Sequence, residues 1–252
     1  MDITRHTGKI AIVTGAGSGI GRATALRLAQ EGATVVACDV NETGLEETTA
    51  LIAASNGTAT YVVGDITSQP DVDRIVAVAG SRVDILANVA GIMDHFIPLG
   101  ELDDATWERV LSVNVTGVMR LSRAVLPIML AQGTGSIVTV ASEATLGAGA
   151  AGVAYTTSKH AVAGLVKSIA YYYGPQGIRS NAVLPGGVET NIGTTAAPLT
   201  TWSMERAQLS MATMGPMAQP DQIATAISWL ASDEASNING ALLTADGGWS
   251  AA

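Results

Sequence analysis

The sequence has little that would support binding to nucleic acid or to an anionic membrane. Lysine occurs only at Lys9, Lys159 and Lys167, and 22 acidic residues outnumber the 13 lysines and arginines, for a formal net charge of -9. Binding to phosphate backbones or anionic lipids depends on a basic patch or stripe. We therefore expect neither a nucleic acid nor a membrane as partner.

Cysteine is almost absent as well. The single Cys38 excludes an internal disulfide and a cysteine-based metal site. His6, His95 and His160 lack the spacing of metal ligands, so no metal is expected.

Long apolar runs are also missing. No stretch approaches the roughly eighteen apolar residues of a transmembrane helix, and residues 1–9 lack the apolar segment of a signal peptide. The 252 residues are 48% hydrophobic and 14% charged, which excludes a disordered chain and suffices for one large core. We expect a soluble, cytoplasmic protein.

Short apolar runs alternate with longer amphipathic segments along the whole chain. Strands are predicted over 9–14, 34–39, 60–63, 83–88, 136–141, 178–184 and 241–245. Helices are predicted over 20–31, 42–55, 69–79, 105–130 with an interruption near Pro127, 153–173 and 221–232. Almost continuously apolar strands indicate a parallel sheet covered on both faces.

The expected fold is therefore α/β: a single Rossmann-type, doubly wound parallel β-sheet with helices on both faces, forming one domain over residues 1–252. The least regular segment, about 187–220, is interpreted as a substrate-loop insertion rather than a second domain.

A glycine-rich turn, TGAGSGIG at residues 14–21, lies between the first predicted strand and the first helix. A helix N-terminus offers unpaired N–H groups that suit a pyrophosphate, and glycines at 15, 19 and 21 allow the backbone to approach it. Taken alone, such a turn is equally compatible with a purely structural role.

Asp39 ends the second strand, where a carboxylate can accept hydrogen bonds from the adenosine ribose. A 2'-phosphate would meet a like charge there, and Val40 and Asn41 supply no cation. This predicts NAD rather than NADP, with a turn-capping Asp39 as the alternative. Asp65 follows the third strand and Asn88 the fourth, so both belong to the same sheet edge.

Tyr155 and Lys159 are one helical turn apart and share a helix face. A phenol titrates near 10 and is a poor base at neutral pH, but a nearby ammonium favours the phenolate. The pair can therefore act as a general acid/base. Ser142 ends the fifth strand, where its hydroxyl can hold a substrate oxygen. Asn114 lies mid-helix, where it either binds water or backbone groups or is satisfied by its own helix.

These residues together resemble the short-chain dehydrogenases/reductases, over nearly the whole chain from Lys9 to Gly248. The resemblance is carried by the glycine turn, by Asn88-Val89-Ala90-Gly91 (with Val89 a departure from Asn-Asn-Ala-Gly), by Asn114, Ser142, Tyr155 and Lys159, by Pro185-Gly186 with Val188 and Thr190, and by Asp246-Gly247-Gly248. The cofactor contacts expected on this basis are Gly15, Ser18, Gly19, Ile20, Gly21, Asp39, Asp65, Ile66, Asn88, Ala90, Gly91, Tyr155, Lys159, Pro185, Gly186, Val188 and Thr190.

The resemblance implies that Tyr155 is the general acid/base and that Lys159 binds the nicotinamide ribose and lowers the Tyr155 pKa. It implies further that Ser142 orients the substrate oxygen and that Asn114 holds a water of a proton relay. It also implies interconversion of an alcohol and a ketone or aldehyde. It further implies a homotetramer or homodimer that pairs the helices at 105–130 and 153–173, as well as the last helix and strand. The residues 171–173 and Trp229 either serve such contacts or fill the core.

The substrate pocket is expected to include Glu143, Met93, His95, Phe96, Trp202 and Met204. Most of these side chains are apolar, which favours a hydrophobic or aryl secondary alcohol or ketone. If Glu143 points inward, it can pair with an amine and make an amino alcohol the substrate; the alternative is a solvated loop carboxylate.

Two other classes of function remain open from the sequence. One is a nucleotide-binding scaffold that does not turn over, against which the complete set Asn114, Ser142, Tyr155 and Lys159 argues. The other is a different reaction on the same fold, namely imine reduction, epimerisation or dehydration.

Overall fold

Seven parallel strands form one sheet in the order β3-β2-β1-β4-β5-β6-β7. The computed structural model describes residues 4–192 and 201–251. The strands are β1 (Ile10–Thr14), β2 (Thr34–Asp39), β3 (Thr58–Val63), β4 (Ile85–Asn88), β5 (Gly135–Val140), β6 (Ile178–Pro185) and β7 (Leu242–Ala245). All six pairings are parallel, which confirms the predicted Rossmann-type sheet.

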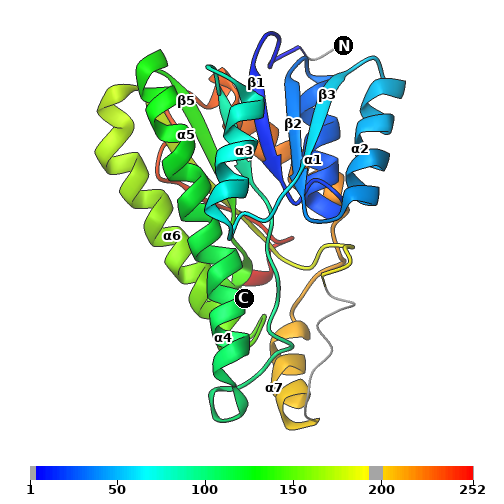
Figure 1. Ribbon diagram of the computed structural model, residues 1–252. Helices are drawn as coiled ribbons and strands as arrows, with labels where there is room; N and C mark the ends of the chain where they lie inside the picture. The colour runs from blue at the N-terminus through cyan, green and yellow to red at the C-terminus, as the bar shows by residue number, and fades with distance from the viewer. Residues whose placement is uncertain (1–3, 193–200, 252) are drawn as a thin grey trace.

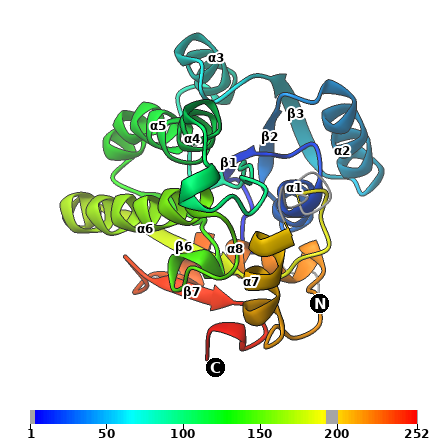
Figure 2. The ribbon, with the colours of Figure 1, turned by 90° about the horizontal axis from the view of Figure 1, so that it is seen from below.

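Helices cover both faces of this sheet (Figure 1). They are α1 (Gly19–Gln30), α2 (Glu42–Ala54), α3 (Gln69–Ala79), α4 (Asp104–Leu111), α5 (Val118–Gln132), α6 (Val153–Tyr173), α7 (Thr201–Met211) and α8 (Pro220–Ala231). Figure 2 shows α1, α2 and α8 on one side of the sheet and α3, α5 and α6 on the other.

Alternation along the strands divides the core into two clusters. Ala11 and Val13 of β1 pack with Leu28 of α1 in one cluster, whereas Ile12 packs with Leu121 of α5 in the other. Successive side chains of a strand point to opposite faces, so strands that are apolar throughout bury both faces.

The helical region that follows β4 differs from the prediction. It breaks at Ser112–Gly117, which forms a π-helical segment, and not at Pro127, which lies inside the continuous α5. A π-helical segment accommodates an extra residue within a helix and is frequent at functional sites. Leu121, Val125 and Met129 on either side of Pro127 are fully buried, and we infer that this packing holds α5 together despite the proline.

Within the expected insertion at 187–220, α7 is a helix that the sequence pattern did not predict. Its composition is mostly polar, so it lacks the apolar periodicity that marks a core helix. Its large apolar residues Leu209 and Trp202 are exposed. Residues 193–200 of the same segment lie outside the described part of the chain.

By length and composition, the helical run Asp104–Gln132 is apolar enough to cross a membrane, with a mean hydropathy of 1.2. The core helix of a soluble protein passes the same test, and α5 contributes to the core beside the sheet, so this run is weak evidence for a membrane span.

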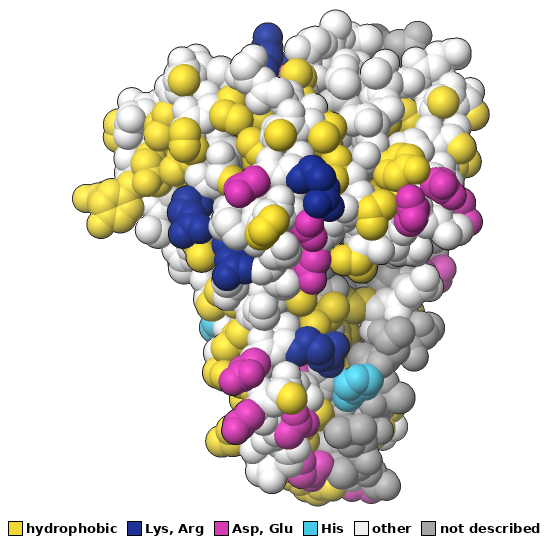
Figure 3. Space-filling view, viewed as in Figure 1, with side chains coloured by type: hydrophobic (Ala, Val, Ile, Leu, Met, Phe, Trp, Pro, Cys, Tyr) yellow, Lys and Arg dark blue, Asp and Glu magenta, His cyan; other side chains and the backbone are white. Residues whose placement is uncertain are grey.

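On the face seen in Figure 3, lysine and arginine side chains are interspersed with acidic ones.

The strand order reverses between β1 and β4, the two strands that start the two halves of the sheet. Ligands of open α/β sheets bind at the carboxyl ends of the strands beside such a switch point. In Figure 1 these ends face the half of the molecule that holds α4 and α7.

Candidate active site

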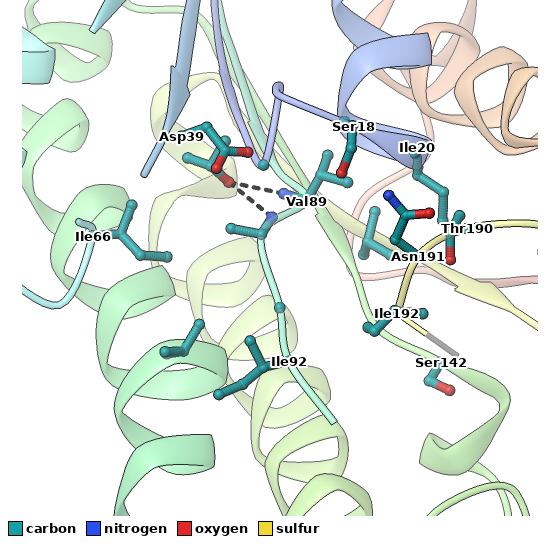
Figure 4. A pocket seen from close by; sticks show the side chains of 18 of the residues that line it. Ser18, Ile20, Asp39, Ile66, Val89, Ile92, Ser142, Thr190, Asn191 and Ile192 are labelled. Carbon is teal, nitrogen blue, oxygen red and sulfur yellow. Dashed lines mark hydrogen bonds between the residues drawn. The ribbon is translucent and has the colours of Figure 1, made fainter. Parts of the chain in front are cut away.

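A cavity of about 550 Å³ lies along the carboxyl edge of the sheet. Its size is in the range of ligand-binding clefts. It is lined by Thr14, Gly15, Ser18, Gly19, Ile20, Gly21, Cys38, Asp39, Val40, Gly64, Asp65, Ile66, Val89, Ala90, Gly91, Ile92, Arg109, Val113, Val140, Ala141, Ser142, Tyr155, Lys159, Pro185, Gly186, Val188, Thr190, Asn191 and Ile192. In Figure 4, Asp39 and Ile66 lie toward one end of the cavity, and Ser142 and Ile192 toward the other.

The glycine turn can adopt its shape only because side chains are missing there. Gly15 and Gly19 have φ of 67° and 50°, a left-handed conformation that favours glycine. A Cβ on Gly15 would lie 3.0 Å from the Cα of Ala90, and one on Gly21 would overlap the carbonyl oxygen of Gly15. The turn therefore forms a bare backbone cradle at the N-terminus of α1, which fits a pyrophosphate.

Thr14 joins the two strand ends that flank this cradle. Its Oγ1 accepts hydrogen bonds from the backbone N–H of Val89, at 3.0 Å, and of Ala90, at 3.1 Å (Figure 4). The ends of β1 and β4 are thus held in fixed register beneath the cavity.

Asp39 both lines the cavity and supports the glycine turn. Its Oδ2 accepts the N–H of Gly17 at 2.9 Å, and its Oδ1 accepts that of Asn41 at 3.0 Å. Asp39 thus caps the turn, as the alternative interpretation predicted. Each of its carboxylate oxygens can still accept a further hydrogen bond from a ligand. The nearby Arg22 is already paired, since its guanidinium donates to the carbonyl of Gly17 at 2.6 Å and to Glu47 at 2.7 Å.

Not all of the residues expected to contact the adenine half line the cavity. Asp65 and Ile66 line the cavity. Asn88 is buried and is not among the lining residues, because its Nδ2 donates to Ser122 of α5 at 3.1 Å. The side chain of Asn88 therefore fastens β4 to α5 beneath the cavity, in contrast to its predicted place among the cofactor contacts.

Ser142, Tyr155 and Lys159 meet at the other end of the cavity. The phenol of Tyr155 shares a hydrogen bond with the Ser142 side chain. The Nζ of Lys159 lies 5.3 Å from the centre of the Tyr155 ring and donates to the carbonyl of Val140 at 2.9 Å. Hydroxyl, phenol and ammonium thus converge, as acid/base chemistry on an alcohol oxygen requires.

Burial shifts the ionisation of both titratable groups. It raises the pKa of Tyr155 to about 12; the bond to Ser142 opposes this rise and the charge of Asp94 adds to it. Burial lowers the pKa of Lys159 to about 8. At neutral pH the phenol is therefore protonated and the amine charged, and further positive charge near the phenol is needed to release its proton.

Asn114 lies in the π-helical segment, buried behind the cavity wall. Its Oδ1 accepts the N–H of Ile92, and its Nδ2 donates to the carbonyl of Ile92, each at 2.9 Å. The same Nδ2 donates to Ser158 at 3.0 Å, and Ser158 donates to the carbonyl of Tyr155. Asn114 is thus satisfied by backbone and side-chain groups outside its own helix, and it ties the loop after β4 to α6.

The other predicted cofactor contacts, Pro185, Gly186, Val188 and Thr190, line the cavity after β6. Several lining residues were not predicted, among them Ile92, Arg109, Val113 and Ile192. Val113 directly precedes Asn114, and Ile92 directly follows Gly91, so adjacency to the motifs was the signal available for both.

None of the six expected substrate-pocket residues lines this cavity. Trp202 is 57% exposed on α7, and His95 and Phe96 take left-handed backbone conformations in the loop after β4. Arg109 and Ile192 are found at the cavity instead. Arg109 and Ile192 are far apart in the sequence, so the tertiary structure determines which residues line this part of the cavity.

Glu143 is not a solvated loop carboxylate. It is 7% exposed, and its Oε2 has no hydrogen-bond partner among the described residues. Burial raises the pKa of this carboxyl, and the charge of Asp246 raises it further. A buried carboxyl without a full set of partners is costly, so this oxygen is an unusual feature of the site.

Comparison with known proteins gives matches over the whole chain. Residues 15–250 match the family described as Enoyl-(Acyl carrier protein) reductase. The chain is 40% identical over 260 residues to 3beta-hydroxysteroid dehydrogenase 2 of Eggerthella lenta, covering 100% of both sequences. The crystal structure of levodione reductase is similar, with a TM-score of 0.91, 33% identity, and coverage of 98% of this chain and 100% of that chain.

Similar solved structures hold both kinds of nicotinamide dinucleotide. A chain from Beutenbergia cavernae was solved with bound NADP at low occupancy; it has a TM-score of 0.88 and 38% identity, with 99% and 100% coverage. A short chain dehydrogenase from Mycobacterium paratuberculosis was solved bound to NAD, with a TM-score of 0.88, 30% identity, and 98% and 100% coverage. The neighbours therefore bind nicotinamide cofactors of either type.

Proposed function

The chain belongs to the short-chain dehydrogenase/reductase family, whose members are nicotinamide-dependent oxidoreductases, and we propose that it transfers a hydride between NAD and a secondary alcohol or ketone. The observation that carries this proposal is the convergence of Ser142, Tyr155 and Lys159 at one end of a cavity whose other end holds Asp39. The whole chain acts as one dinucleotide-binding and catalytic domain.

The residues at the cavity fit a dinucleotide. The backbone cradle at Gly15–Gly21 would hold the pyrophosphate, and the Asp39 carboxylate would accept hydrogen bonds from the ribose hydroxyls. NAD is favoured over NADP because a 2'-phosphate would face the Asp39 carboxylate, while Arg22 is already paired with Glu47. When bound, NAD supplies the hydride acceptor, and NADH the hydride donor.

In alcohol oxidation, the Ser142 hydroxyl orients the substrate oxygen and the Tyr155 phenolate takes the proton of the alcohol hydroxyl. In ketone reduction, the Tyr155 phenol gives its proton to the developing alkoxide. Lys159 favours the phenolate by its positive charge, and it lines the cavity beside the phenol. Asn114 supports this arrangement by holding Ile92 and Ser158, and it anchors a water of the proton relay.

The substrate is a hydrophobic or aryl secondary alcohol or ketone. Support comes from the apolar side chains of Ile92, Val113 and Ile192 at the cavity and from the relative whose name specifies a hydroxysteroid. Within this class we propose an amino alcohol, because Glu143 directly follows Ser142 and is buried, although Glu143 does not itself line the cavity.

The working form is a cytoplasmic homotetramer or homodimer. Tyr171 and Tyr172 on α6 are 77% and 66% exposed and stack edge to face, with ring centres 5.2 Å apart. Exposed apolar side chains that form a contiguous patch can mark protein–protein contacts.

The test is NADH formation, followed at about 340 nm, with NAD or NADP and a panel of secondary alcohols. We expect turnover with NAD, little with NADP, and loss of turnover in Tyr155→Phe. Tyr171→Phe removes a tyrosine hydroxyl at an exposed position. It serves as the control and should keep activity. NAD binding without turnover of any alcohol or ketone would favour a scaffold or another reaction instead.

A further inference from the structure

The helix that carries Tyr155 is capped from outside by the loop after β4. Its N-cap, Gly152, has no side chain to satisfy the first N–H groups of α6, which have no partner within the helix. Asp94 does so instead: its Oδ1 accepts the N–H of Gly152 at 3.0 Å, and its Oδ2 that of Tyr155 at 2.9 Å. The carbonyl of Ile97 accepts the N–H of Val153 at 3.0 Å.

This contact is close and fully buried. Asp94 has 0% exposure. A Cβ on Gly152 would overlap the backbone nitrogen of Ile97 and lie 2.6 Å from both carboxylate oxygens of Asp94. A side chain at position 152 would therefore push the loop and the helix apart.

The loop bends sharply to reach the helix. His95 and Phe96, between Asp94 and Ile97, both have φ of 56°. This conformation is uncommon for residues other than glycine and unfavourable for a bulky one. Such strain persists where the surrounding structure imposes it, often beside an active site.

We propose that Asp94 is a positioning residue for the general acid/base Tyr155: its carboxylate fixes the first turn of α6 and sets a negative charge beside the phenol. This inference rests on the proposed function, in which Tyr155 exchanges the proton with the substrate. A carboxylate is stabilised by the helix dipole when it lies at a helix N-terminus, and Asp94 binds the first N–H groups of α6 at that position.

The groups that face the phenol come from three elements. Lys159 lies one turn along α6, Ser142 comes from the end of β5, and Asp94 from the loop after β4. The charge of Asp94 raises the pKa of Tyr155, in the same direction as burial, and the Ser142 hydrogen bond lowers it. Asp94 therefore favours the protonated phenol, which is the form that ketone reduction uses.

The experiment compares Asp94→Asn with Asp103→Asn. Asp103 caps α4 in a similar way, accepting the N–H of Thr106 at 2.7 Å, but it does not contact α6 through any described hydrogen bond. The enzyme is labelled with fluorotyrosine, and the fluorine resonance of residue 155, identified by its loss in Tyr155→Phe, is titrated without cofactor or substrate. The pH profile of kcat for alcohol oxidation and the NAD dissociation constant are measured in parallel.

In Asp94→Asn we expect the phenol to titrate about one pH unit lower than in the parent, and the maximal kcat to fall about tenfold or more, with NAD affinity kept. Asp103→Asn should change none of these. An unshifted phenol midpoint in Asp94→Asn, or an unchanged kcat, would overturn the proposal. A variant without a cooperative unfolding transition is not properly folded. If Asp94→Asn behaves in this way, Asp94→Ser, which keeps a capping oxygen without charge, takes its place with the same expectations.

Failure of the proposed function would be recognised separately. An enzyme that turns over no alcohol or ketone would contradict the hydride-transfer assignment, while the cofactor-free titration would still decide whether the charge of Asp94 acts on Tyr155.

Discussion

The ammonium of Lys159 donates a hydrogen bond to the carbonyl of Val140 at 2.9 Å, while it stands 5.3 Å from the centre of the Tyr155 ring. The amine is thus anchored to the last residue of β5 and not to the phenol. An ammonium has three donors, and among the described residues only Val140 accepts a hydrogen bond from it. The other donors are available to ligand hydroxyls in the cavity.

Burial of this amine should lower stability at neutral pH. Burial lowers the pKa of Lys159 from 10.5 to about 8, which corresponds to about 3 kcal/mol against the charged form. Between pH 8 and 10.5 the unfolded chain binds more protons than the folded one, so the stability of the parent rises with pH in this window. Lys159→Met should therefore be more stable than the parent at pH 7, with the difference shrinking as pH rises. Urea unfolding at several pH values measures this; a pH-independent difference would contradict it.

Asp39 should set the choice between NAD and NADP. Asp39→Asn removes the charge that a 2'-phosphate would face but keeps an oxygen for the Gly17 or Asn41 N–H. We expect the ratio of kcat/KM for NADP over NAD to rise about tenfold or more. Asp65→Asn removes another acidic group lining the same cavity and should leave the ratio unchanged. Equal shifts in the two variants would mean that Asp39 has no special role.

Glu143 should distinguish substrates that carry an amine from those that do not. In Glu143→Gln, kcat/KM for an aryl amino alcohol should fall at least about tenfold, because a buried charge loses its partner. The corresponding aryl alcohol without the amine should be unaffected. Burial raises the pKa of this carboxyl, so Glu143 should become protonated at a higher pH than an ordinary glutamate. As the pH falls, the parent should therefore lose its preference for the amine at a pH above the usual range for a glutamate.

The matched control is Glu189→Gln. Glu189 is an exposed carboxylate between Val188 and Thr190, which line the cavity, and its loss should not alter the preference. If Glu143→Gln handles both alcohols as the parent does, the amine-pairing hypothesis is wrong.

The π-helical segment should be intolerant of added volume. A Cβ on Gly117 would lie 2.6 Å from the Cγ1 of Ile66, so Gly117→Ala should destabilise the fold by about 1–3 kcal/mol through overpacking. Gly164, within α6, has no atom within 4 Å of such a Cβ, and Gly164→Ala should stabilise by up to about 1 kcal/mol through helix propensity. Thermal unfolding of both variants tests this, and equal effects would contradict it.

Local sequence patterns were enough for the sheet and its helices. All seven strands of the described sheet, and the helices that cover it, follow from apolar runs and periodicity, and α3 and α6 have the predicted bounds Gln69–Ala79 and Val153–Tyr173. The cavity edge was also predictable, because residues that follow parallel strands must gather at one end of the sheet. Ser142, Tyr155 and Lys159 were identified in this way, from residue type and spacing.

Other features depend on contacts between distant segments. The sequence placed Asn88 at the cofactor, whereas its amide is held by Ser122. It left open whether Glu143 is solvated, and the structure buries it. The break in the long helix could not be located from Pro127, because packing of α5 outweighs the local preference of proline.

The sequence by itself therefore determined the order of elements, the phosphate-binding turn and the types of side chain available for chemistry, since these follow from near-neighbour preferences along the chain. Only the tertiary structure decided how those side chains are held. The cap that Asp94 places on the helix of Tyr155 joins residues that are far apart in the chain, and no local periodicity encodes such a contact. It exists because the sheet brings the ends of β4 and β5 together and leaves the N–H groups of α6 in need of an acceptor.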